Sequence, residues 1–265
     1  MRPFSFVSLA LAGVVCTAAA QTGVQPNLVL TIFGGAVTGH ELWAVGKQPL
    51  SVLGTSNYDT LELSRSITSS IVVGAAATYF VSPHVGLHLE MSYLGLPIES
   101  GCIGLYYNAD AENKNQQVCD GIQAQPSDGG AITIFGGVTL RAAPRRSFSP
   151  YVRGNVGIVN QSRSTIDMAG AFADGSGAVF VRQVIADPKP RRTSVLLGAA
   201  AGFTTPLGPG YQFRLEARDL IVSLDRLIGP ANALGIGPVA ARSYHHIALT
   251  LGLDVVLERK RGRRY

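Results

Sequence analysis

Strict alternation between apolar and polar side chains is the feature of this sequence that most limits its fold. From position 85 to 93 every odd-numbered residue is apolar, and the residues between them include His88, Glu90 and Ser92. Successive side chains of a β-strand point to opposite faces, so a period of two residues predicts a strand with one apolar and one polar face. Residues 247–257 repeat the pattern and predict a second strand of the same kind.

The same period recurs along the chain and predicts an all-β protein. Eight segments carry it: residues 27–38, 70–81, 84–95, 129–141, 150–161, 194–205, 211–218 and 246–257.

The connections between these segments alternate in length. Short connections fall at 82–83, 142–149 and 206–210, and long ones at 39–66, 96–128, 162–192 and 223–242. Short turns at one end and long loops at the other are the layout of an outer-membrane barrel, whereas structureless loops of roughly 20 to 30 residues are uncommon in a compact soluble domain. We therefore expect a closed up-and-down antiparallel transmembrane β-barrel of about eight strands, with long extracellular loops and short periplasmic turns.

The N-terminus has the pattern of an export signal. Arg2 precedes an apolar run over residues 7–15, and Ala18 and Ala20 provide the small residues of a cleavage site. We expect a signal peptide over residues 1–20, an outer-membrane barrel over 21–257 and a basic tail over 258–265.

Alternation alone leaves the direction of the apolar face open, because a soluble barrel would turn it inward. Strands of 10 to 13 residues tilted by about 40° span roughly 25 to 30 Å, the height of a lipid-facing band. Aromatic residues on the apolar phase lie beside the short connections (Tyr79, Phe203 and Tyr211) or near the other strand end (Tyr93), as in an aromatic girdle. We therefore expect the apolar face to contact lipid.

An outward apolar face encloses the charged side chains. Eight strands leave room only for side chains, and buried charges are costly unless they are paired. We expect a hydrogen-bonded ion network inside the barrel; the alternative is a narrow ion-conducting path. Its candidate members are His88, Glu90, Arg141, Arg153, Arg214, Glu216, Arg218, His246 and Asp254.

Charge and cysteine content limit the possible partners. The formal net charge is +5, but it resides in Arg2 and the basic tail, so the barrel has no basic excess for nucleic acid. Cys102 and Cys119 lie 17 residues apart in one polar segment without histidine, which favours a disulfide over a metal site. No metal or other cofactor is expected.

The leader, the eight-strand rhythm, the stretches 86–95 and 213–219 and the closing strand resemble the small outer-membrane β-barrels of the opacity-protein and outer-membrane protein A transmembrane-domain type. The similarity covers residues 24–257 and implies location in the bacterial outer membrane. Such proteins usually end on the final aromatic residue of the last strand, whereas here a basic tail follows.

The function expected from these features is a non-enzymatic structural or surface-interaction role. The alternatives are a narrow channel and a lipid A-modifying enzyme. Ser243 stands near His245 and His246, but the sequence shows no acid beside them to complete a hydrolytic site. Expected partners are outer-membrane lipids and lipopolysaccharide, the barrel-assembly machinery during insertion, and an extracellular partner at the loops.

Overall fold

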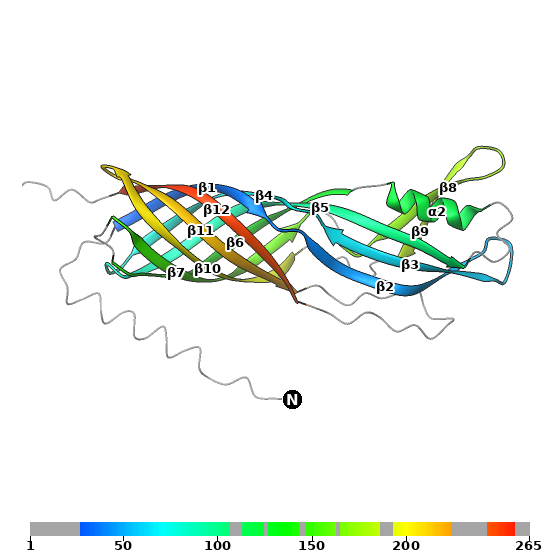
Figure 1. Ribbon diagram of the computed structural model, residues 1–265, viewed down its shortest axis with the longest axis horizontal. Helices are drawn as coiled ribbons and strands as arrows, with labels where there is room; N and C mark the ends of the chain where they lie inside the picture. The colour runs from blue at the N-terminus through cyan, green and yellow to red at the C-terminus, as the bar shows by residue number, and fades with distance from the viewer. Residues whose placement is uncertain are drawn as a thin grey trace, which may run out of the picture.

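Eight antiparallel strands close into a ring of hydrogen bonds in the computed structural model (Figure 1). Each strand pairs with the next around the ring, and β12 returns to pair with β1. Each of the eight predicted segments forms one ring strand, so the barrel prediction is confirmed. In ring order the strands are β1 (Asn27–Val37), β4 (Ser70–Phe80), β5 (Val85–Tyr106), β6 (Ser127–Arg141), β7 (Ser149–Gln161), β10 (Thr193–Gly208), β11 (Tyr211–Ser223) and β12 (Ser243–Leu257).

The structure describes residues 27–106, 113–124, 127–143, 147–162, 165–185, 193–223 and 243–257. The predicted signal peptide and basic tail lie outside these ranges, as does nearly all of the last long connection. Among the described residues, no helix is long and apolar enough to cross a bilayer.

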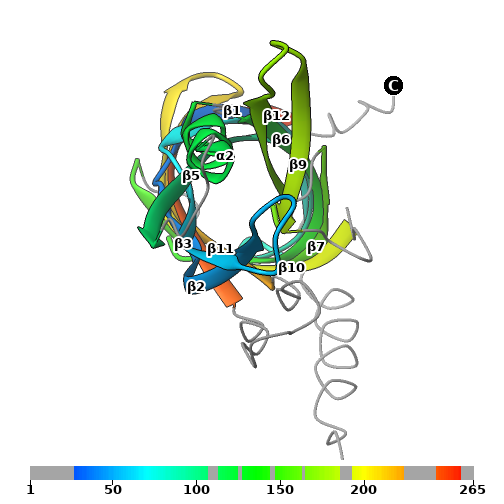
Figure 2. The same cartoon turned by 90° about the vertical axis from the view of Figure 1, so that its right-hand side faces the viewer.

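Three of the four long connections contain regular structure, which corrects the expectation of structureless loops. They hold the hairpin β2 (His40–Ser51) and β3 (Tyr58–Ile67), the helix α2 (Lys114–Gln123), and the hairpin β8 (Met168–Ala173) and β9 (Val179–Ile185). β3 pairs with the outer part of β5, from Ile98 onward, which continues out of the ring. We call β2, β3, the outer part of β5, α2, β8 and β9 the head. The head extends the barrel at the end opposite the short turns (Figure 1), and Figure 2 views the ring from this end.

The head has buried apolar residues, and they belong to a cluster that continues into the adjoining end of the barrel. Leu61 and Leu63 of β3 are fully buried, and Val118 and Ile122 of α2 are buried in the same cluster. A disulfide joins Cys102 of β5 to Cys119 of α2. Helix α2 also packs closely on β8: a Cβ atom added at Gly170 would lie only 2.0 Å from the carbonyl oxygen of Val118. These contacts make the head a folded unit.

The barrel wall is inverted relative to a soluble protein. Leu89 is 61% exposed, while the next residue, Glu90, is 1% exposed. The same alternation follows β12, where Leu249 and Leu251 face outward and Thr250 is buried. From Ile247 to Leu257 the outward apolar residues span roughly 25 Å along the barrel axis, the height of a hydrocarbon layer.

Candidate functional site

A cluster of paired charges fills the middle of the barrel, and Glu90 of β5 is one of its two central carboxylates. Its Oε1 lies 2.6 Å from an Nη atom of Arg218, and its Oε2 lies 3.3 Å from Arg153 and 3.2 Å from Nε2 of His88. The other ring nitrogen of His88 lies 3.0 Å from the hydroxyl of Thr78. Strand β5 therefore connects to β4, β7 and β11 across the interior.

Glu216 of β11 is the second central carboxylate. It lies 2.6 Å from Arg218 and 3.2 Å from Arg153, so it shares both guanidinium groups with Glu90. Tyr151 donates a hydrogen bond of 2.6 Å to Oε2 of Glu216. The position of Tyr151 on the same strand phase as Arg153 is the sequence signal that could have placed it in the interior.

The third acid of the cluster is Asp254 of β12. Arg214 binds it through two nitrogens, at 2.9 Å and 2.8 Å, and Thr31 of β1 donates a further hydrogen bond of 2.7 Å. Arg214 also lies 3.8 Å from Glu216, which joins this pair to the central cluster. Three carboxylates thus face three guanidinium groups, and the buried charge balances, as buried ions require.

Small residues leave room for these long side chains. A Cβ added at Gly202 would lie 2.8 Å from the hydroxyl oxygen of Tyr151, and one at Gly74 would lie 2.6 Å from the ring of Phe33. The Phe33 ring in turn supports the guanidinium of Arg218, 4.5 Å from its centroid. The glycines on the inward phase therefore shape the interior.

Two of the nine candidate network residues lie apart from the cluster. Arg141 sits at the turn end, where it donates to the carbonyl of Pro83 and covers the ring of Phe80, and it pairs with no carboxylate among the described residues. His246 sits toward the head, edge-on to His40 with ring centroids 4.5 Å apart. The alternation of the sequence predicts that both side chains point inward. It does not predict where along the barrel axis they lie.

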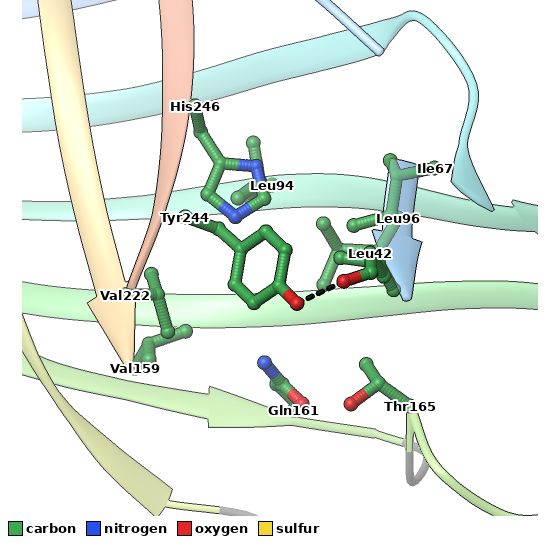
Figure 3. Close-up of a pocket in the computed structure, with 10 residues that line it drawn as sticks. All are labelled: Leu42, Ile67, Leu94, Leu96, Val159, Gln161, Thr165, Val222, Tyr244 and His246. Carbon is green, nitrogen blue, oxygen red and sulfur yellow. Dashed lines mark hydrogen bonds between the residues drawn. The ribbon is translucent and has the colours of Figure 1, made fainter. Parts of the chain in front are cut away.

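Between the charged cluster and the head, the interior of the barrel is lined by apolar side chains. The inward residues of β5 there are Leu94 and Leu96, followed by Ile98, and all three are apolar and buried. They help to enclose a chamber of only about 10 Å³, close to the space that one water molecule needs (Figure 3). Tyr244 lies across this chamber and donates a hydrogen bond to the carbonyl of Leu42.

Two side chains of the head hold the segment from Thr165 to Asp167, and Thr165 also lines the chamber. The indole of Trp43 donates to the carbonyl of Thr165 at 3.0 Å, and Arg65 donates to the carbonyl of Asp167 at 2.6 Å. Burial lowers the pKa of Arg65, and the negative charge of Asp167 opposes this shift. Burial also lowers the pKa of His40 beside the chamber. The charged cluster thus fills the middle of the barrel, and the chamber on its head side is small.

Aromatic residues lie around the end of the barrel that carries the short turns. Tyr79 and Tyr211 are each close to half exposed, and the ring of Phe203 packs at a tilt against the exposed ring of Phe148, with centroids 4.8 Å apart. Phe148 lies in a short turn and was missed because it precedes its strand. Tyr93, 46% exposed, lies nearer the head end.

The rim at the head end contains an acid that the sequence analysis missed. Oδ2 of Asp219, on β11, lies 2.7 Å from Nδ1 of His245, on β12. The expectation that no acid stands beside Ser243 and His245 is therefore wrong. Asp219 was overlooked because it lies 26 residues away in sequence and comes near His245 only through strand pairing. Among the described residues, no group of three or more His, Cys, Asp or Glu is arranged to hold a metal ion.

Comparisons with known proteins find solved structures with a similar fold but no protein that is similar in sequence. No family model matches the chain, and no curated protein matches it in sequence. Neisserial surface protein A is 12% identical, with a TM-score of 0.37 over 88% of this chain and 99% of that one. The outer membrane protein OprG from Pseudomonas aeruginosa is 12% identical, with a TM-score of 0.47 over 88% and 96%. The outer membrane protease OmpT from Escherichia coli is 8% identical, with a TM-score of 0.40 over 90% and 100%.

These solved structures are bacterial outer-membrane proteins, and they include a protease. The class of this chain is fixed by its own geometry: it is a small eight-stranded β-barrel of the outer-membrane type, with its first and last strands paired.

Proposed function

We propose that this chain is an integral protein of the bacterial outer membrane that acts through its head, as a surface-interaction protein. The observation that carries the proposal is the inverted barrel wall: a belt of exposed Leu, Val and Ile surrounds buried arginine and glutamate. In water the exposed apolar belt would be unfavourable. In a bilayer the belt contacts hydrocarbon, and the closed wall keeps the charged side chains away from that hydrocarbon. Export through a signal peptide over residues 1–20 and insertion by the barrel-assembly machinery belong to the same proposal.

The closed interior favours interaction over transport. Paired charges fill the middle of the barrel, and the apolar layer above them leaves a chamber of only about 10 Å³. A narrow ion channel, the second candidate, requires a continuous hydrated path, which this packing opposes. The head, by contrast, is a folded extension that a disulfide and a buried apolar cluster shared with the barrel hold together.

The β8–β9 hairpin of the head offers an apolar contact surface. Val179 and Val181 of β9 are 70% and 75% exposed, and Phe180 between them is 47% exposed. Apolar side chains gathered at the end of a long head suit contact with an extracellular partner. Lipopolysaccharide and other outer-membrane lipids are the partners of the belt below.

Site-directed labelling of intact cells tests the placement. Ser176, in the β8–β9 turn of the head, and Leu207, at the opposite end of the barrel, are each replaced by cysteine. A membrane-impermeant maleimide should label S176C on intact cells and L207C only after the membrane is broken. Equal labelling of both, or of neither, refutes the proposed orientation.

A double variant, V179S/V181S, tests the role of the head. Cells that carry it at normal surface expression should no longer be retained on a hydrophobic surface.

A further inference from the structure

We propose that Ser243, His245 and Asp219 form a serine-esterase site on the outer wall of the barrel, which cleaves an ester-linked acyl chain of a lipid in the outer leaflet. The inference rests on the membrane placement proposed above. It differs from the function of the head, because the three residues lie on the lipid-facing side of the wall.

The site is at the correct height for a lipid ester. On β12 the outward residues from Ile247 to Leu257 are apolar, and His245 and Ser243 are the next two outward residues toward the head. On β11 Asp219 continues the outward phase beyond Ala217. On β12, Ser243 and His245 therefore stand where the apolar outward residues of that strand end, and Asp219 lies beside them between Ala217 and Ile221 of β11. The ester linkages between acyl chains and headgroups occupy this boundary in a bilayer.

The acid and the base are already in contact. Nδ1 of His245 lies 2.7 Å from Oδ2 of Asp219, with exposed side-chain fractions of 58% and 37%. A carboxylate that accepts the Nδ1 proton fixes the tautomer whose Nε2 is a free base, and it stabilises the imidazolium ion formed during catalysis. The other carboxylate oxygen of Asp219 is buried and has no hydrogen-bond partner in the described part of the chain. His245 is thus the only hydrogen-bond partner of this acid there.

The proposed nucleophile, Ser243, lies beyond His245 on the head side of β12, whereas Asp219 lies on the opposite side of His245 along the register. Register places Asp219 opposite Ile247, on the membrane side of His245, and Ser243 lies two residues away on the head side. Residues two apart on a strand share a face and lie roughly 6.6 Å apart at Cα, a distance that an imidazole spans. Ser243 is exposed, so a lipid reaches it from the side. Acid, base and hydroxyl therefore run in order from the membrane outward.

The proposed ester hydrolysis needs only the three side chains, the lipid ester and water. Nε2 of His245 takes the proton of the Ser243 hydroxyl while Oγ attacks the ester carbonyl carbon, and a C–O bond forms. The bond to the alcohol then breaks, and the leaving alkoxide takes the proton back from His245. Water attacks the resulting acyl-serine by the same steps, which releases a fatty acid and regenerates Ser243. Asp219 remains ionised throughout.

The experiment uses the full chain reconstituted into two sets of vesicles, one of phospholipid alone and one that also contains lipopolysaccharide. Flotation first confirms insertion, and released fatty acid is then identified by mass spectrometry. Wild type should release fatty acid, and the lipid set that yields it identifies the source. S243A and H245A should each lose about 1000-fold in rate, and D219N at least about 100-fold.

A fluorophosphonate probe supplies a readout other than turnover. It should modify Ser243 in the wild type, modify H245A much more slowly, and leave S243A unlabelled. T38V is the matched control, because Thr38 places an exposed hydroxyl at the same rim, 3.1 Å from the carbonyl of Ile247, and it should release fatty acid at the wild-type rate. Inserted protein that releases no fatty acid from either vesicle set overturns the esterase proposal alone. Failure to float overturns the membrane placement as well.

Discussion

Replacing Glu216 with glutamine removes one negative charge from the barrel interior at almost constant volume. The side chain is fully buried and lies 2.6, 3.2 and 3.8 Å from the guanidinium groups of Arg218, Arg153 and Arg214. After E216Q, three buried arginines face only two carboxylates. Breaking a buried ion pair from one side costs about 3 to 5 kcal/mol, and glutamine retains part of the hydrogen bonding, so we expect a loss of about 3 kcal/mol. That corresponds to about 150-fold in the unfolding equilibrium constant.

Urea titration of the protein in lipid vesicles, read as the fraction of heat-modifiable folded barrel on a gel, measures this loss. The gel shift is the appropriate probe, because the single tryptophan, Trp43, reports on the head instead. The double variant E216Q/R153M removes one charge of each sign and restores the balance. It should therefore be more stable than the sum of the two single losses by at least about 1.5 kcal/mol. Strict additivity, or a loss below about 0.5 kcal/mol for E216Q, would falsify the description of the interior as one interdependent cluster.

Three further outcomes are expected. G170V forces a side chain into the backbone of α2 at Val118, so limited proteolysis should cleave the head of this variant while the barrel keeps its gel shift. Replacing Cys102 and Cys119 with serine should destabilise the head by about 3 kcal/mol, seen in the Trp43 fluorescence transition, with the barrel transition unchanged. Wild-type protein in planar bilayers should show no discrete conductance steps in dilute or concentrated KCl; steady single-channel openings would contradict the closed interior.

The eight ring strands could be predicted from sequence because each carries its own local signal. A strand with lipid on one side and packed side chains on the other must alternate, so the period appears within about ten residues. The inward phase located His88, Glu90, Arg153 and Glu216, and the structure places these side chains within one cluster.

The sequence does not predict the head, in part because β2 does not keep this period. β2 has register shifts between Glu41 and Trp43 and between Val45 and Gln48, which break the alternation of its buried residues. β3 does alternate, with Leu61 and Leu63 inward, but it lies within the stretch 39–66 that the spacing of the ring strands predicts as a long loop. The core of the head also joins segments that are distant in sequence, and no local pattern reveals such contacts.

Contacts between residues on neighbouring strands are the second feature that a single sequence does not predict. Asp219 interrupts the outward apolar phase of β11, and its partner His245 lies on the next strand. A single sequence shows an isolated acid at that position. Only the register, fixed by the turn at one end and by side-chain packing along the wall, brings the two residues together.

The pairing of β1 with β12 means that the barrel is completed by the two ends of the chain. The hydrogen bond from Thr31 to Asp254 joins residues 223 positions apart. Without β12, β1 would have a free edge whose backbone groups hydrocarbon does not satisfy. A chain truncated before Ser243 should therefore be unable to form a stable closed barrel in a bilayer.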